Sequence, residues 1–192
     1  MENKFLAHIA EDGREQTVFE HLAAEFSRPF GGEAQGLLAG TAHDIGKYSA
    51  AFQRRLTGDS RRVDHATAGA FECMGRGQPF AAFAVAGHHG GLPDGGGRGD
   101  GPEAATFWGR IKRAGRGGLE PYGAWAREVS LPGGQPPPFA KQNPGAGMFF
   151  IRMLYSCLVA ADFLDTEAFM SGKPYGSCSG CWKKKAPSIR PL

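Results

Sequence analysis

The chain has 192 residues, of which 41% are hydrophobic, and a formal net charge of +3 at neutral pH. This length and composition favour one well-formed core over two separate ones. The mild positive charge is compatible with a nucleic-acid partner but does not require one, so charge alone excludes neither an enzyme nor a binding module.

Segment composition sets the expected compartment. The first residues lack a basic start followed by an apolar run, and the most apolar stretch, 148–161, is short and contains Arg152. Neither a signal peptide nor a membrane span is therefore expected. The four cysteines are too few and too scattered for the disulfide framework of a secreted domain, so a cytoplasmic protein is expected.

Hydrophobic spacing predicts α-helices from the start of the chain. Apolar residues recur at four-residue steps in 15–26, which predicts a helix with His21 near its inward side. A second amphipathic segment, 38–56, is interrupted by Gly46 and carries His43 and Asp44 in its middle.

Two shorter helices and a loop come next. Asp64 is placed to cap a third helix, with His65 in its first turn. Residues 80–87 predict a fourth helix that ends at His88. Residues 90–101 contain so many glycines that they predict a mobile loop.

The second half of the chain ends in one long helix. Residues 103–116 and 121–129 predict two less regular helices, and 131–147 form a proline- and glycine-rich connection. Residues 148–169 are apolar on nearly every face, which predicts the central buried helix of a bundle, with Asp162 directly after the apolar run. No alternation is long enough for a sheet, so the predicted fold is all-α.

Clustered histidines are the main chemical signal in the sequence. Five of the six take part: His21, His43, His65, His88 and His89. They recur at intervals of roughly 20 residues, about one short helix and one turn, so successive helices can present a ligand to one point. Burying such an imidazole, or a carboxylate such as Asp162, costs several kcal/mol unless a hydrogen bond, a charge or a metal compensates it. Imidazole with carboxylate suits a borderline divalent ion, which predicts a metal-dependent hydrolase.

The strings around these residues resemble a known family. They are AHDIGKYSAAFQ (42–53), DHATAGA (64–70), AGHHGGLPD (86–94) and ADFLDTE (161–167). Together with His21, and in this order, they resemble the HD-domain nuclease of type I CRISPR systems over about residues 5–170. The HD pair alone is shared by many phosphohydrolases, whereas HHGGLPD after a DH pair is more specific. The resemblance implies an HD-type helical bundle over 1–170, and the composition of 171–192 predicts a flexible basic tail or linker remnant.

The resemblance also implies a site for two divalent ions. One ion would be held by His21, His43, Asp44 and Asp162, and the other by Asp44, His65, His88 and His89. The bridging role of Asp44 agrees with the chemistry of the ligands, because a carboxylate has two oxygens able to span ions about 3.5–4 Å apart, whereas a neutral imidazole offers one lone pair. Lys47, one turn after His43, would hold a phosphate oxygen or neutralise Asp44.

Two-metal hydrolysis is the implied mechanism. A water activated between the ions attacks phosphorus in line, and no protein nucleophile is needed. The sequence agrees with this, since it has no GxSxG string and no cysteine in a catalytic signature. Manganese, iron, cobalt or nickel suits an imidazole-rich site better than magnesium does.

The implied substrate is single-stranded DNA, cut after a CRISPR helicase unwinds it for the surveillance complex. The chain has no GxxxxGK[ST] phosphate loop and too few residues for a motor, so a stand-alone subunit or a fragment of a helicase-nuclease is expected. A set of basic residues either lines a path for the DNA backbone or forms ordinary solvated helix faces: Arg54, Arg55, Arg61, Arg62, Arg110, Lys112, Arg113 and Arg116. Aromatic residues such as Phe52 either stack bases or belong to the core, as is usual at helical spacing.

Two other functions stay open from the sequence. One is an HD phosphohydrolase acting on a small nucleotide, which needs the HD pair and Asp162 but gives His65, His88 and His89 no evident reason. The other is a catalytically silent module that binds nucleic acid or a partner complex, with metal serving only to hold the fold.

Several polar residues near the motifs have simpler expected roles. Asp64 is predicted to be an N-cap only, His8 a surface residue and Asp165 a helix-end residue outside the metal site. Cys178 and Cys181 resemble half of a zinc knuckle or a redox pair, but no second pair lies nearby to complete a tetrahedral site. The surrounding composition favours a disordered tail instead.

Overall fold

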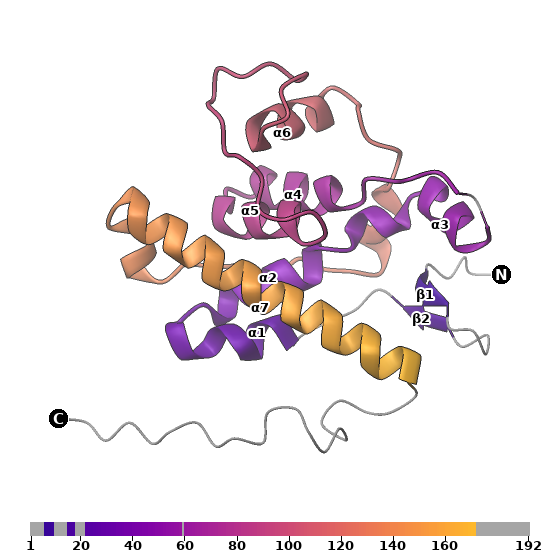
Figure 1. Cartoon of the computed structure of the whole chain (residues 1–192), viewed down its shortest axis with the longest axis horizontal. Coiled ribbons are helices and arrows are strands. Elements are labelled where there is room, and N and C mark those ends of the chain that lie inside the picture. The colour runs from indigo at the N-terminus through magenta and orange to yellow at the C-terminus, as the bar shows by residue number, and fades with distance from the viewer. Residues whose placement is uncertain (1–5, 10–14, 18–21, 59, 172–192) are drawn as a thin grey trace.

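The computed structural model describes residues 6–9, 15–17, 22–58 and 60–171 (Figure 1). This described part contains, in chain order, β1 (Leu6–Ile9), β2 (Glu15–Thr17), α1 (Leu22–Ser27), η1 (Arg28–Phe30), α2 (Glu33–Ala42), η2 (Ile45–Tyr48), α3 (Ala50–Leu56), α4 (Ala66–Gly75), α5 (Pro79–Gly87), α6 (Phe107–Gly115), η3 (Gly123–Arg127), η4 (Pro138–Lys141) and α7 (Pro144–Ser171). The α elements are α-helices, and the η elements are short 3-10 helices. The body of the molecule is helical, as predicted.

Helix α2 is the centre of the packing. It contacts α1, α4, α5 and α7, and most of its residues are buried. Its buried Gln35 joins three segments: the amide donates to Gln78 Oε1 (2.8 Å) and to the Gly134 carbonyl (2.7 Å), and its oxygen accepts from the Ala81 N–H (3.1 Å). The helix that carries His43 and Asp44 at its end is therefore held on several sides.

Small residues allow the helices to approach this closely. A Cβ on Gly36 of α2 would collide with the Ala23 carbonyl of α1, and a Cβ on Gly69 of α4 would collide with the Ala42 carbonyl of α2. The buried residues of α4 and α5 are mostly alanine and other small residues as well. Short side chains bring backbones together, which fixes the positions of the helix ends.

The helices are arranged in layers (Figure 1). Helices α4 and α5 pack on each other, with α6 against α4 on one side and α7 against α5 on the other. Aromatic rings fill the space beside α7, where Phe150 makes edge contacts with Phe30, Phe80 and Phe139 at centroid distances of 5.9, 5.5 and 5.8 Å. These rings anchor α7 and thereby position Asp162, three turns further along that helix.

The helix predicted at 15–26 was wrong in its first half. Residues Glu15–Thr17 form a strand that pairs antiparallel with Leu6–Ile9, in the register Leu6↔Thr17 and Ile9↔Glu15. The helix begins only at Leu22. Pairing with a segment earlier in the chain overrides the local helical spacing, and two strands this short carry no recognisable alternation.

The segment predicted as one interrupted helix, 38–56, is three pieces. Helix α2 ends at Ala42, η2 spans Ile45–Tyr48, and α3 starts after Ser49, whose hydroxyl accepts from the Phe52 N–H (3.3 Å). The interruption at Gly46 was predicted, and its cause is a close contact. A Cβ at Gly46 would collide with the backbone of His65. The chain at Gly46 therefore passes directly against the residue before α4.

Helix α7 is longer at both ends than the helix predicted at 148–169, and it is not the fully buried centre of the bundle. One face is buried, at positions that include Phe150, Leu154 and Leu158, while Phe149 and Phe163 are 57% and 66% exposed. Within the described residues, α7 is the helix long and apolar enough to cross a membrane. That is weak evidence for a span, because core helices pass the same test.

The predicted loops and minor helices are only partly as expected, because the connection predicted at 131–147 contains η4 and the first residues of α7. Residues 90–101 contain no helix or strand, and the Asp100 carboxylate organises their end by accepting from the Gly97 N–H (3.1 Å) and the Thr106 hydroxyl (2.6 Å). The helix predicted at 103–116 starts later, at Phe107, because Thr106 caps it. The helix predicted at 121–129 is a 3-10 turn, and the tail at 172–192 lies outside the described residues.

Candidate metal centre

The close contact at Gly46 brings the first two motifs together. It sets the junction of α2 and η2, which carries His43 and Asp44, against the start of α4, which carries His65. His65 Nε2 consequently lies 3.7 Å from Asp44 Oδ1. Helix α5 packs on α4 and ends beside them, so His88 Nε2 reaches 4.0 Å from the same oxygen.

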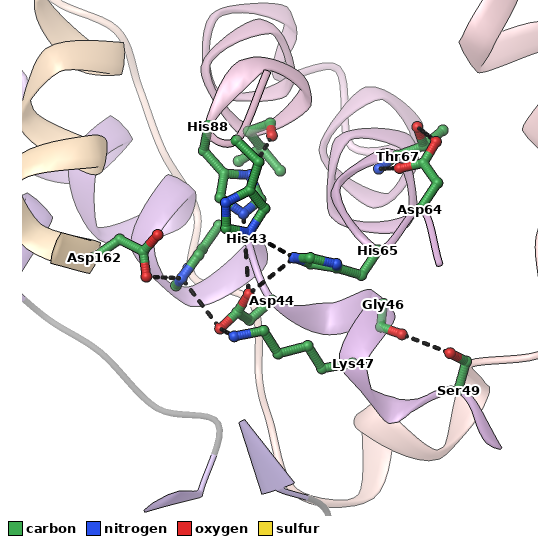
Figure 2. Close-up of polar contacts among 12 residues, drawn as sticks. His43, Asp44, Gly46, Lys47, Ser49, Asp64, His65, Thr67, His88 and Asp162 are labelled. Atoms are coloured by element: carbon green, nitrogen blue, oxygen red, sulfur yellow. Dashed lines mark hydrogen bonds and ion pairs between the residues drawn. The ribbon is translucent and has the colours of Figure 1, made fainter. Parts of the chain in front are cut away.

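Asp44 is the hub of the cluster, and its two oxygens have different surroundings (Figure 2). Oδ2 lies 2.6 Å from Lys47 Nζ and 3.3 Å from His43 Nε2. Oδ1 faces His65 and His88 at the longer distances given above. One oxygen is thus held by an ammonium group, and the other is directed at imidazole nitrogens that are too far away to hydrogen-bond to it.

Four residues offer ligand atoms that converge on one point. Asp44, His65, His88 and His89 each contribute one atom, and these atoms all lie within 4.8 Å of one another. His65 Nε2 and His89 Nε2 are 2.8 Å apart. An ion bound about 2.0–2.2 Å from each ligand atom needs separations of this order between the ligands.

Hydrogen bonds on the outer side of the imidazoles orient their inner nitrogens. His88 Nδ1 lies 2.7 Å from the Val85 carbonyl, and His43 Nδ1 lies 2.7 Å from the Gly40 carbonyl. A carbonyl only accepts, so each Nδ1 must carry the hydrogen. The neutral His88 ring therefore presents a lone pair on Nε2, toward Asp44, which is the arrangement typical of metal-ligating histidines.

Several buried polar atoms of the cluster have no hydrogen-bond partner. They include Asp44 Oδ1 and His88 Nε2, together with Nδ1 of His65. Leaving such atoms unsatisfied costs about 1–3 kcal/mol each, more for a charged group. A divalent cation between Asp44 Oδ1 and His88 Nε2 would satisfy both, so the donor set fits a metal ion.

A second group of residues lies on the Oδ2 side of Asp44. His43 Nε2 is 3.7 Å from Asp162 Oδ1, and the Asp162 side chain points from α7 toward His43 (Figure 2). These residues form the described part of the other predicted ion site. His21, the remaining predicted ligand, lies outside the described residues.

Burial and charge give the imidazoles different protonation states. Burial lowers the pKa of His65 to about 4 and that of His88 to about 3, and it also lowers the pKa of His89. These three rings are neutral at pH 7, the form that binds metal. Burial alone would lower the pKa of His43 too, but the carboxylates of Asp44 and Asp162 outweigh it and raise that pKa well above its ordinary value.

The carboxylates of the cluster are charged at neutral pH. Burial disfavours the charge on Asp44, yet His43 and Lys47 hold the pKa of Asp44 well below its usual range. The same competition, between burial and His43, lowers the pKa of Asp162. Without metal, a protonated His43 and the Lys47 ammonium balance these two carboxylates.

The residues set aside in the sequence occupy other places. Asp64 accepts hydrogen bonds from the Thr67 N–H (3.1 Å) and hydroxyl (2.6 Å), as a cap of α4 does, but it also pairs with Arg110 (3.5 Å). Phe52 is 6% exposed and packs edge-on against His65 at 5.1 Å, so it is a core residue. Asp165 lies one turn beyond Asp162 on α7. Cys178 and Cys181 lie outside the described residues, as does the His8 side chain.

Sequence reasoning missed the role of Arg110. Its guanidinium donates to the Thr67 hydroxyl (2.6 Å), to the Ala86 carbonyl (2.9 Å) and to Asp64 (3.5 Å). It therefore ties the start of α4 to the end of α5, two residues from His65 and from His88. Its sequence neighbours are basic as well, so composition gave no signal that separated it from them.

No family model matches this chain, and no curated protein sequence matches it. The structure shows a helical protein with a buried histidine and aspartate cluster that can hold a metal ion.

Proposed function

We propose that this chain is a metal-dependent phosphodiesterase of the HD type that cuts single-stranded DNA in CRISPR antiviral defence. The main support for the proposal is that the ligand atoms of Asp44, His65, His88 and His89 lie within 4.8 Å of one another. Two of these atoms, on Asp44 and His88, are buried without a hydrogen-bond partner. The small-nucleotide alternative left the last three histidines unexplained, whereas a bridged metal site uses all of them.

A bound divalent ion would supply Lewis-acid chemistry, polarising a phosphoryl oxygen and lowering the pKa of a coordinated water. The residues of the chain do the rest. Three neutral imidazoles and one carboxylate oxygen favour manganese, iron, cobalt or nickel over magnesium, which prefers oxygen ligands alone. His89 is the exposed member of the four, so substrate would approach the cluster from its side.

The arrangement around Asp44 supports the two-ion form of the proposal. Oδ1 faces His65 and His88, with His89 beside His65. Oδ2 lies near His43, whose ring also faces Asp162. A carboxylate that bridges two ions needs this division. Lys47 lies 2.6 Å from Oδ2 and would have to move before an ion binds there, so the Oδ1 site is expected to fill first.

The partners proposed for this activity are a CRISPR helicase and, through it, the surveillance complex, in the cytoplasm. Cutting of single-stranded DNA by the isolated chain needs neither of them.

The test uses circular single-stranded DNA with the purified chain and manganese. Wild type is expected to cut, and Asp44→Asn and His88→Gln are expected to lose cutting by at least about 100-fold, since metal ligands and their neighbours typically matter to this degree. Glu33→Gln, which alters an exposed carboxylate at the other end of α2, is the matched control and should keep full activity.

Two outcomes would contradict the proposal. Equal cutting by wild type and both variants would show that the nuclease activity lies elsewhere. Release of phosphate from mononucleotides without any DNA cutting would identify the small-nucleotide hydrolase instead. Metal analysis of the same samples should find the ion in wild type and in Glu33→Gln but not in Asp44→Asn.

A further inference from the structure

A cleft lies on the other side of the first turn of α4 from the metal centre. It has a volume of about 280 Å³ and runs between α3, residues 61–64, and α6 with the segment that follows it. Asp64 and Thr67 line it, whereas His65, between them in sequence, points toward Asp44 (Figure 2). The cleft and the metal centre are thus neighbours that share a helix end but no lining side chain.

Positive charge dominates the lining of this cleft. Five arginines contribute to it, Arg54, Arg61, Arg62, Arg110 and Arg113, against two carboxylates, Asp64 and Glu120. The Asp64 carboxylate accepts two hydrogen bonds from Thr67 and pairs with Arg110 at 3.5 Å. Among the described residues, neither Arg54 nor Arg62 forms an ion pair. Guanidinium groups gathered in this way repel one another, and an anion between them would remove that repulsion.

Arg110 gives the cleft a fixed point. Its hydrogen bonds to Thr67 and Ala86 hold the guanidinium in one orientation, and its side chain is 21% exposed. A positioned guanidinium binds a phosphate oxygen at a smaller entropic cost than a freely moving one. The other four arginines are exposed and reach the same space from α3, from the segment before α4 and from α6.

The rest of the lining narrows the ligand class. The apolar residues there are Ala51, Val63, Ala114 and Leu119, and no aromatic side chain lines the cleft. A pocket that recognised a base would be expected to offer an aromatic ring or an arginine plane backed by one. The lining offers forked donors instead, which suit the oxygens of a phosphate group.

We infer that this arginine cleft is a phosphate-binding site, distinct from the metal centre. The phosphate can belong to a nucleic-acid strand or to a small nucleotide, and the chemistry of recognition is the same in both. The inference does not depend on the proposed hydrolysis, because binding here needs no metal.

The test measures binding to chelator-treated protein by titration calorimetry, with pyrophosphate as the probe. The double variant Arg54→Gln/Arg62→Gln is compared with the control Arg55→Gln/Arg116→Gln. The control also removes two positive charges, one on α3 and one directly after α6, but neither residue lines the cleft. Wild type and the second variant are expected to bind equally, and the first is expected to bind about tenfold more weakly. Circular dichroism spectra of both variants confirm folding.

Three results decide the matter. Equal weakening by both double variants, or no pyrophosphate binding to wild type, would overturn the cleft as a site. Loss confined to the first variant supports it, whether or not the protein cuts DNA. Parallel titrations with a mononucleotide and with a short single-stranded oligonucleotide then identify the source, since a strand site binds the oligonucleotide more tightly.

Discussion

Asp44 and Lys47 form a buried ion pair in a protein with few other buried charges among its described residues. Their charged atoms are 2.6 Å apart, and their side chains are 7% and 3% exposed. Removing one member of such a pair leaves the other charge buried without compensation, which costs more than the pair itself contributes. The stability of the metal-free chain should therefore depend on this pair, although His43 compensates part of the charge on Asp44.

A double-mutant cycle tests this dependence. In chelator, Asp44→Asn is expected to lower the free energy of unfolding by about 3–5 kcal/mol, because the buried Lys47 ammonium loses its ion pair with the Asp44 carboxylate. Adding Lys47→Met removes that charge, so the double variant should be more stable than Asp44→Asn alone. Urea unfolding of the four proteins measures the coupling. Simple additivity of the two single changes would show that the pair does not interact.

For single residues, the sequence predicted which side chains belong to the metal cluster better than it predicted the hydrogen bonds that surround the cluster. The roughly regular spacing of His43, His65 and His88 allowed these residues to converge, and the capping hydrogen bond of Asp64 was predicted. Nothing in the sequence separates Arg110, which links α4 to α5, from the solvated arginines beside it. The difference depends on which carbonyl and hydroxyl lie within reach, and this is set by packing.

Among the elements, the contact between α2 and α4 sets the geometry of the centre. Gly69 of α4 touches the Ala42 carbonyl of α2, directly before His43 and Asp44. Any side chain at position 69 must push α4 away, and His65 lies at the start of that helix. Packing at this glycine and the position of a proposed ligand are therefore linked.

Replacing Gly69 tests this link. Gly69→Ala is expected to cost about 1–3 kcal/mol of stability through overpacking, and to weaken metal binding by moving His65. Gly75→Ala is the matched control in the same helix, where a Cβ meets open space and alanine is the better helix former. Thermal unfolding and metal titration of both variants measure the effect. A Gly69→Ala protein as stable as Gly75→Ala would contradict the close contact.

Element boundaries show where local patterns stop being informative. Helix α5 was predicted almost to the residue, because proline starts it and it is apolar throughout. The strands β1 and β2 were missed because each is too short to show alternation and depends on pairing with the other. Helix α2, rather than α7, occupies the central position. Its small residues let neighbouring helices pack more closely against it than they can against the more apolar α7. Apolar content predicted burial for α7, but it did not predict which helix lies in the middle.

At the scale of the whole molecule, the proposed ligands tie together parts that are distant in sequence. They come from the end of α2, the start of α4 and the end of α5, with Asp162 added from α7. Ions bound between these segments stabilise the folded state and have no comparable site in the unfolded chain. Metal should thus act on global stability as well as on activity.

Chelation measures that contribution. Manganese at about 100 times its dissociation constant is expected to add about 2.7 kcal/mol, which appears as a rise of several degrees in the melting temperature of wild type. Asp44→Asn should melt at the same temperature with manganese or with chelator. A melting temperature that is independent of metal in wild type would show that the cluster binds no ion in the folded state.

The unequal exposure of the four ligands has a kinetic consequence. His89 is exposed, whereas Asp44, His65 and His88 are buried. An ion that leaves this centre would release its contacts on the His89 side first, because only there can water replace a ligand without displacing a packed helix. Exchange of bound metal should consequently begin with release of the His89 imidazole. Its rate would then depend on how readily the His89 side chain moves, rather than on how tightly the three buried ligands bind the ion.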